Sequence, residues 1–398
     1  MNSRKSIFIA IRENKNAIFL TSIYTSALLL LLGHLFYDLY TGGDEWKQGD
    51  WLINNAGGLV RRGLMGSFLI KVSSSLNISV LQLLIALQAL ITSLIFAFFW
   101  YFGLKYRNSD IVFFLLISPL FLIFWSNNAD ASMRKEILSY LAFIPLLFCL
   151  LENSHLTKKF VIMSICVYLI AVYSHEGNIF FAPFYILIIY IDRKKVDYYV
   201  FISSITYFVI STSGLVYALS FSTVSDTTEI CQAILHSGVN EKICNGAIAW
   251  LERDSRYAVG STYDMMLSGA SLLLLHSITF IFLYIIFLLS NIFGVIRTTW
   301  LLLFSIFAFS PLYVIGIDWG RWLNFSIFSF TAIFLTWVTK RKRPEIFRKF
   351  DSYAWLVCFV FCVTWGVHHV GGAPDFMYGF IYQNVKFVHS SFDFLLNP

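Results

Sequence analysis

Long apolar segments without charged residues place the strongest limit on how this chain folds. The segments 79–103 and 267–289 contain no Asp, Glu, Lys or Arg. A helix of about 20 such residues crosses the hydrocarbon core of a bilayer. The composition agrees, because 58% of the 398 residues are hydrophobic and only 13% are charged, far from the average of soluble proteins. We therefore expect an all-α, polytopic integral membrane protein.

About eleven segments are predicted to cross the membrane. The first begins after Lys15 and is not followed by a small-residue cleavage pattern, so we interpret it as a retained helix and not as a signal peptide. Several segments are shorter than the roughly 20 residues of a full span, and the short pair 160–174 and 179–191 is also compatible with one kinked or re-entrant unit. The predicted spans are 17–37, 79–103, 111–126, 137–152, 160–174, 179–191, 199–219, 267–289, 299–316, 323–339 and 353–370.

The basic residues predict the orientation. The clearest cluster is Lys340, Arg341, Lys342 and Arg343, and loops rich in Lys and Arg face the cytoplasm. With eleven spans the N-terminus is then cytoplasmic, and the tail from Gly371 is periplasmic. The net charge of +6 is spread over loops where orientation and lipid headgroups explain it, so it does not point to nucleic acid. We expect a single transmembrane domain, 1–398, with a first periplasmic loop at 38–78 and a large one at 220–266.

Four polar junctions between apolar segments fall on the same predicted side of the membrane. Charged residues at such places are costly beside lipid and usually serve a partner or a substrate. Because the expected topology puts all four on the periplasmic face, we expect one shared site there. The junctions are 50–62, 127–136, 174–178 and 317–322.

The first junction combines basic and acidic residues with an amphipathic segment. Apolar residues recur at helical spacing from Val60 to Val72, which predicts a short helix lying in the membrane interface. Arg61 and Arg62 then either contact lipid phosphates or form a basic clamp at the mouth of an outward-facing cavity. In the second case Asp50 or Asp44 is the neighbouring carboxylate.

The second junction leads into the fourth predicted span. Asn127, Asn128 or Asp130 is expected to cap that helix, which places Arg134 and Lys135 near its first turn. Cations there oppose the helix dipole, whereas a bound anion gains from the dipole and the charges together. The alternative is a simple surface pair of Asp130 with Arg134, four residues apart.

The third junction holds His175 and Glu176 beside the flexible Gly177. This arrangement suits a general base or a group that orients an acceptor hydroxyl. It is equally typical of a structural hydrogen-bonded pair. The HExxH spacing of metalloproteases is missing, so no metal is predicted.

The fourth junction places Asp318 and Arg321 between two tryptophans. The arginine either binds a substrate phosphate or pairs with the aspartate. Trp319 and Trp322 suit the interfacial aromatic belt or stacking on a sugar ring. Trp51 in the first loop is the third candidate for sugar stacking.

The cysteines and the missing motifs restrict the chemistry further. Cys231 and Cys244 lie in the large loop on the oxidising side, where a disulfide would stabilise the loop. The sequence contains no cysteine metal cluster, phosphate-binding glycine loop or nucleotide fingerprint. We therefore expect neither a metal nor a cofactor, and no direct use of ATP or a nucleotide sugar.

Arginines, carboxylates and a histidine on one outer face suit a lipid-linked sugar phosphate. Arginine binds phosphoryl oxygens in a two-pronged manner and stays charged near lipid, while a carboxylate or histidine deprotonates an acceptor hydroxyl. The aromatic-rich, eleven-span layout with arginine-bearing outer loops resembles the bacterial O-antigen or capsule repeat-unit polymerases. More broadly, it resembles the GT-C-like membrane glycosyltransferases that use polyprenyl-linked donors. The likeness covers the whole chain as a pattern, without a short family motif. One departure is that the larger outer loops here are the first and the fourth.

The resemblance implies a polymerase that joins polyprenyl-pyrophosphate-linked oligosaccharides at the periplasmic face of the bacterial inner membrane. Chain-length regulator and flippase proteins would be its partners, along with membrane lipids. One alternative is a transferase that moves a single sugar from a polyprenyl phosphate, with Asp50 or Asp44 as base. Another is a flippase or transporter, which would carry charges near the membrane midplane. The predicted pyrophosphate ligands are Arg61, Arg62, Arg134, Lys135 and Arg321, and the predicted bases are Glu176, His175, Asp318 and Asp50.

Overall fold

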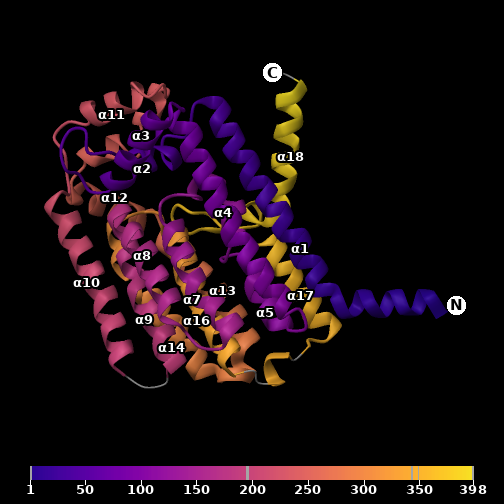
Figure 1. Cartoon of the computed structure of the whole chain (residues 1–398). Coiled ribbons are helices and arrows are strands. Elements are labelled where there is room, and N and C mark those ends of the chain that lie inside the picture. The colour runs from indigo at the N-terminus through magenta and orange to yellow at the C-terminus, as the bar shows by residue number, and fades with distance from the viewer. Residues whose placement is uncertain (1, 194–196, 342–343, 348, 397–398) are drawn as a thin grey trace.

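The computed structural model describes residues 2–193, 197–341, 344–347 and 349–396. Within these ranges the chain is almost entirely helical (Figure 1), so the all-α prediction is confirmed. Five helices are long and apolar enough to cross a membrane, as expected of a multi-pass membrane protein. They are α1 (Asn2–Thr41, of which Asn14–Thr41 is the apolar part), α4 (Val80–Lys105), α10 (Tyr198–Ser220), α13 (Ala270–Phe293) and α16 (Trp319–Arg341).

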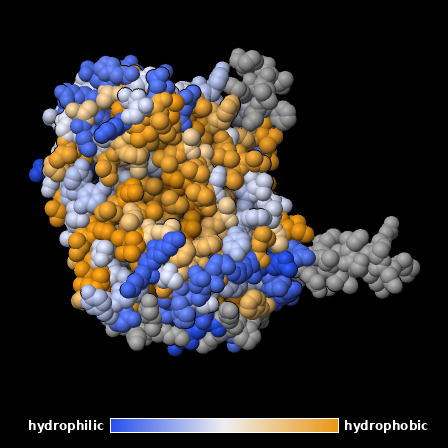
Figure 2. Space-filling model, in the orientation of Figure 1, coloured by the Kyte–Doolittle hydropathy of each residue, from blue (hydrophilic) through white to orange (hydrophobic). Residues whose placement is uncertain are grey.

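Shorter helices complete the bundle. Figure 2 shows an apolar band across the middle of one face, between more polar ends, which is the pattern of a protein surrounded by lipid. The shorter bundle helices are α5 (Asp110–Leu116), α6 (Ile123–Asn127), α7 (Ile137–Asn153), α8 (Lys158–Ser174), α9 (Ala182–Arg193), α14 (Val295–Ala308), α15 (Ser310–Ile315) and α17 (Ser352–Thr364), with the 3₁₀ turns η1 (Ala129–Ala131), η2 (Glu176–Phe181) and η5 (Pro344–Phe347).

Helix α16 forms the centre of the bundle. Nearly all of its side chains are buried. Its Phe328 ring lies 3.8 Å from the ring of Tyr140 in α7, and the Tyr140 hydroxyl donates to the side-chain oxygen of Asn324 at 2.7 Å. Packed aromatic rings bury large apolar areas. These contacts fix the start of α16, where the fourth polar junction lies.

The predicted span 111–126 is broken into α5 and α6. Pro119 disfavours a helical conformation of the residue before it, and the chain runs through a buried turn between the two helices. Backbone groups at such a break need partners away from water. The Asn324 amide donates to the carbonyls of Leu120 and Phe121, both at 2.9 Å, and the Tyr24 hydroxyl donates to that of Leu116 at 2.9 Å.

Other predicted spans also differ in detail. Pro311 lies in the first turn of α15, which begins at Ser310, so the segment 299–316 is divided. The pair 160–174 and 179–191 forms two helices, α8 and α9, joined by η2. The predicted span 353–370 ends as a helix at Thr364, after which β1 (Gly366–Val367) pairs antiparallel with β2 (Pro374–Asp375). The 3₁₀ turn η6 (Phe376–Tyr378) and helix α18 (Phe380–Leu396) follow.

The two predicted large loops gather at one end of the bundle, at the top of Figure 1. The carbonyl of Glu45 accepts the N–H of Ala247 at 3.0 Å, and the Asn54 amide donates to the carbonyl of Ile230 at 2.9 Å. The first loop contains α2 (Lys47–Leu52) and α3 (Gly63–Leu76), and the second contains α11 (Thr228–Leu235), η3 (Glu241–Cys244), η4 (Ala249–Glu252) and α12 (Ser255–Leu267).

Two local predictions in these loops are confirmed, a helix after Val60 and a disulfide in the large loop; the position of that helix in the membrane interface stays a prediction. Helix α3 is the amphipathic helix, with Met65 and Leu69 buried and Phe68 exposed. Cys231 and Cys244 form a disulfide with a Cα–Cα distance of 5.9 Å, which joins α11 to η3. Of the basic cluster that predicted the orientation, Lys340 and Arg341 end α16, whereas Lys342 and Arg343 lie outside the described residues.

Candidate functional site

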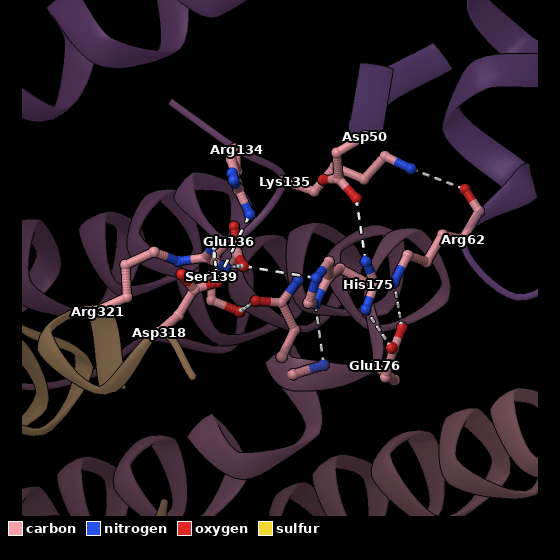
Figure 3. A network of polar contacts seen from close by, with 12 residues as sticks. Asp50, Arg62, Arg134, Lys135, Glu136, Ser139, His175, Glu176, Asp318 and Arg321 are labelled. Carbon is pink, nitrogen blue, oxygen red and sulfur yellow. Dashed lines mark hydrogen bonds and ion pairs between the residues drawn. The ribbon is translucent and has the colours of Figure 1, made fainter. Parts of the chain in front are cut away.

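The structure brings the four polar junctions together at the end of the bundle where the loops gather. Figure 3 shows side chains from α2, from the turn before α3, from the approach to α7, from the α8–α9 connection and from the start of α16 in one network. Glu136 and Arg321, 185 residues apart in sequence, are in direct contact. Residues that the sequence separates by whole helices therefore form one site.

Arg62 is the centre of the first ion cluster. Its Nε donates to Oε2 of Glu176 at 2.7 Å and a terminal nitrogen donates to Oε1. Another terminal nitrogen lies 3.3 Å from Oδ1 of Asp50, and Arg61 lies 3.7 Å from Glu176. Burial by itself opposes ionisation of Glu176, but the charge of Arg62 holds its pKa well below the usual value. Glu176 is therefore a structural counter-ion that is paired with both arginines.

Arg62 is held in this position by its backbone. Its φ is +68°, in the left-handed region that few non-glycine residues occupy. The ammonium group of Lys135 donates to the Arg62 carbonyl at 2.8 Å, and burial lowers the pKa of Lys135 to about 8. Lys135 thus supports the arginine and does not line the cavity described below.

Arg321 is the centre of the second ion cluster. It contacts Glu136 and donates to Oδ2 of Asp318 at 2.8 Å. Arg134 lies 3.7 Å from the same Asp318 oxygen. The Asp318–Arg321 pair was one of the two alternatives considered for this junction. The partner of Arg134 is Asp318, in place of the Asp130 considered from the sequence.

His175 faces the second cluster but has little capacity to act as a base. Its Nδ1 accepts the N–H of Gly177 at 3.0 Å, so Nε2 carries the proton and faces Oε1 of Glu136 at 3.5 Å. Burial lowers the pKa of His175. Both ring nitrogens of the neutral imidazole are therefore engaged.

The capping prediction for the fourth span is wrong. Helix α7 begins at Ile137, and its N-terminal residue Glu136 makes no side-chain cap. Asn128 instead reaches the C-terminal hairpin, where its amide donates to the carbonyl of Val367 at 2.9 Å and its oxygen accepts the N–H of His369 at 3.0 Å. Asn128, one of the three residues expected to cap the helix, therefore holds a distant segment in place.

A cavity of about 420 Å³ borders the two ion clusters. Its polar side chains come from all four junctions, and loop residues that the sequence analysis did not consider complete its wall. Arg61, Lys135 and Glu176 do not line it. The lining residues include Trp46, Asp50, Arg62, Arg134, His175, Trp250, Asp318, Arg321, Trp322 and His369.

Among the cavity-lining residues in the described part of the chain, three buried polar atoms have no hydrogen-bond partner. They are Oδ2 of Asp50, Nε of Arg134 and Nε1 of Trp322. Burial opposes ionisation of Asp50, but the charges of Lys135 and Arg62 lower its pKa to about 2, so it is a carboxylate at neutral pH. An unpaired buried acceptor or donor costs about 1–3 kcal/mol. A ligand with a hydroxyl and an anionic group would satisfy the unpaired atoms of Asp50 and Arg134.

The aromatic residues at the cavity differ from those predicted. Trp51 and Trp319 are almost fully buried, and their indole N–H groups donate to the carbonyls of Met133 and Tyr313. Neither ring faces the cavity, so the structure does not support sugar stacking on them. Trp322 does line the cavity, and the Arg321 guanidinium lies 4.8 Å from its ring centre.

Two tryptophans that the sequence analysis missed also line the cavity. Trp46 comes from the first loop and Trp250 from η4, and their ring centres are 5.6 Å apart. Trp46 precedes Asp50 by four residues, about one helical turn, which is a signal the sequence contained. For Trp250 the disulfide-bearing loop offered no such signal.

Asp44 lies outside the cavity. Its Oδ1 accepts the backbone N–H groups of Trp46 and Lys47, at 2.9 and 2.6 Å, so it stabilises the start of α2. It does not line the cavity, and the structure does not support it as a base. Among the described residues, no group of His, Cys, Asp and Glu has the arrangement of a metal site.

The chemistry of the cavity is the basis for any functional assignment, because no protein-family model, curated protein or solved structure matches this chain. The cavity combines an arginine with an unpaired donor, a carboxylate with an unpaired acceptor and three indole rings. It lies at one end of a bundle of apolar helices.

Proposed function

We propose that the chain is a membrane glycosyltransferase that takes a polyprenyl-linked sugar at this cavity, and that its reaction is the polymerisation of pyrophosphate-linked oligosaccharide repeats. The observation that carries the proposal is the pair of unpaired buried atoms, Nε of Arg134 and Oδ2 of Asp50, in two residues that line the cavity. A phosphate satisfies the first and an acceptor hydroxyl satisfies the second.

Arg134 is the main phosphate ligand in this proposal. Arg62 and Arg321 each already contact two carboxylates, so their charges are largely compensated. Arg134 is closest to a single carboxylate oxygen at 3.7 Å, and its guanidinium lies 5.8 Å from the Trp46 ring centre. A guanidinium binds phosphoryl oxygens in a two-pronged manner. Arg321 then contributes by holding Asp318 in place.

The indole rings of Trp46, Trp250 and Trp322 suit the sugar part of the substrate. An aromatic face binds the apolar side of a sugar ring, and tryptophan adds an N–H donor. The cavity volume of about 420 Å³ is typical of small-molecule sites. It would enclose the reacting sugar and phosphate, while the rest of a repeat unit extends outside.

We propose the orientation predicted from the basic residues, with a cytoplasmic N-terminus, a periplasmic C-terminus and about eleven crossings. Two features support it. The disulfide lies in the loops at the cavity end, and disulfides persist on the oxidising side. Lys340 and Arg341 lie at the opposite end of α16. The cavity would then face the periplasm of a bacterial inner membrane.

Transfer of a single sugar from a polyprenyl phosphate is the second candidate. The observation that favours it is the unpaired oxygen of Asp50, an acid in the first loop, where the GT-C-like enzymes usually carry one. A transporter fits less well, because transporters bind their substrates near the membrane midplane. Between Leu323 and Thr339 the central helix α16 contains no charged residue.

The surface polysaccharide of a deletion strain separates these reactions. Loss of a polymerase leaves lipid capped with one repeat and no ladder of longer chains, whereas loss of a single-sugar transferase leaves a ladder whose units lack one sugar. Wild-type protein should restore the ladder, and Arg134→Lys should not, because lysine cannot make a two-pronged contact. Arg107→Lys, at an exposed position on the opposite end, is the matched control. An unchanged polysaccharide in the deletion strain would refute both reactions.

A further inference from the structure

The C-terminal hairpin places a second histidine, His369, on the cavity wall. The hairpin consists of β1, β2 and the turn between them. From the sequence this segment was expected to end a span and begin a periplasmic tail. In the structure it packs against the start of α16, and His369 lines the cavity together with Asp318 and Arg134.

The backbone of His369 is fixed from two sides. Its N–H donates to the side-chain oxygen of Asn128 at 3.0 Å, and its carbonyl accepts the N–H of Gly320 at 2.9 Å. Two residues further, the N–H of Gly371 donates to the carbonyl of Ile317 at 2.8 Å. These bonds connect the hairpin to the second and fourth polar junctions, so the position of His369 is set by the site itself.

Gly320 allows this close approach. A Cβ atom at position 320 would lie 2.1 Å from the carbonyl oxygen of His368, far inside van der Waals contact. Only glycine lets the hairpin reach the first turn of α16. The glycine between Trp319 and Arg321 is therefore explained by the placement of the hairpin.

The rings of the two cavity histidines differ in what they can still bind. Both nitrogens of His175 are engaged with Gly177 and Glu136. The ring of His369 makes no hydrogen bond within the described part of the chain and contacts the ring of His368 at 4.6 Å between centres. Of the two, His369 has a ring nitrogen available to a substrate in the cavity.

The groups around His369 keep its imidazole neutral. Burial lowers its pKa to about 4, while the nearby carboxylate of Asp318 acts in the opposite direction. Arg134, Arg321 and His368 also disfavour its charged form. A proton gained during reaction would be stabilised by the negative charge of Asp318.

We propose that His369 accepts the proton of the acceptor hydroxyl during glycosyl transfer; this inference rests on the function proposed above. The acceptor O–H proton passes to a ring nitrogen of His369, and the hydroxyl oxygen forms a bond to the anomeric carbon of the donor sugar. The bond from that carbon to the phosphate oxygen breaks, and its electron pair leaves with the polyprenyl pyrophosphate beside Arg134. The imidazolium then returns its proton to solvent.

Asp50, which also lines the cavity, is the competing base. Its carboxylate is held by Arg62 at 3.3 Å, and its pKa is about 2, so it is a weaker proton acceptor than His369. Asp50 then orients the acceptor hydroxyl through its unpaired oxygen, and His369 removes the proton.

The test uses the full-length protein in detergent with the polyprenyl-linked single repeat extracted from the deletion strain. His369→Ala should lower kcat by about 10²–10⁴-fold, the usual contribution of a general base. Added imidazole should restore part of the rate. The adjacent His368→Gln is the matched control: His368 does not line the cavity, so this variant should keep a rate near that of the wild type. The same variants are also compared for ladder formation in cells.

Each outcome has one meaning. Restoration of His369→Ala by imidazole, with His368→Gln active, supports proton transfer. The role of His369 is overturned if His369→Ala keeps the wild-type rate, or if imidazole does not restore its lost rate. In either case the proposed function still stands as long as the wild-type protein forms the ladder. A wild-type protein that extends no chains in cells or in detergent overturns the proposed function and this inference together.

Discussion

The contact between Glu136 and Arg321 should be the most strongly stabilising ion pair of the site. Both side chains are almost fully buried, with 5% and 4% exposed, and they join α16 to the segment before α7. Removing one partner of a buried pair leaves an uncompensated charge and costs about 3–5 kcal/mol. Arg321 keeps Asp318 at 2.8 Å, so we expect about 3 kcal/mol for Glu136→Gln.

A double-mutant cycle isolates the interaction from the other effects of each change. Arg321→Gln alone loses two carboxylate partners, and we expect it to cost about 4 kcal/mol. The double variant should cost less than the sum of the single changes, which gives a coupling of about 2 kcal/mol. The measurement is the free energy of unfolding from titration with SDS in mixed micelles, for wild type, both single variants and the double variant.

Lys105 and Glu152 provide the matched control. They form a pair of similar chemistry at 2.8 Å, but their side chains are 40% and 33% exposed. Exposed pairs contribute about 0–1 kcal/mol. If the coupling between Glu136 and Arg321 is as small as that of the control pair, burial does not strengthen the site pair and the reasoning is refuted.

Three further predictions concern the loops and the buried lysine. Replacing Cys231 and Cys244 by serine should reduce the free energy of unfolding by about 3 kcal/mol, the usual value for a loop of this size, and should make the large loop more sensitive to protease; equal proteolysis of wild type and variant would argue against it. Gly320→Ala should displace the hairpin and lower the melting temperature, whereas Gly260→Ala, where a Cβ meets nothing within 4 Å, should not; equal melting temperatures would contradict the close approach. The pKa of Lys135 is lowered from 10.5 to about 8 in the folded protein, so the folded state binds fewer protons between these values, and stability should rise with pH across that window by up to about 3 kcal/mol. Lys135→Met should lack this rise, which chemical denaturation at several pH values would detect.

The apolar pattern of the sequence determined the fold class. Segments such as 79–103 and 267–289 can satisfy their backbone in lipid only as helices, so an all-α membrane protein followed from composition and segment length. The amphipathic segment after Val60 became α3 for the same local reason, and two cysteines in one loop became the disulfide. These features depend on residues close together in the sequence.

The breaks within the helices were only partly readable from the sequence. Pro119 and Pro311 mark the interrupted segments, but a proline alone does not decide whether a helix bends or ends. The decision came from tertiary partners, since Asn324 and Tyr24 bind the carbonyl groups exposed at the first break. Hydropathy does not record which distant side chain supplies such a bond.

The sequence predicted which residues gather at the candidate site, but it did not predict how their side chains pair. Charge at the ends of apolar segments was enough to single out Asp50, Arg134, His175 and Arg321, because charges beside lipid require a partner. The pairing of these charges depends on contacts between residues as far apart as Glu136 and Arg321. The same contacts decide which cavity-lining residues keep an unpaired atom. The sequence likewise did not show that Trp51 and Trp319 are buried outside the cavity.

His369 was absent from the predicted site for a related reason. Its neighbours Asn128 and Gly320 lie 241 and 49 residues away in sequence, and only the folding of the hairpin against α16 brings them together. Local patterns of hydropathy and charge fix what each segment is, because those preferences act over a few residues. The chemistry of the cavity depends on hydrogen bonds and ion pairs between segments, and these exist only after the helices have packed.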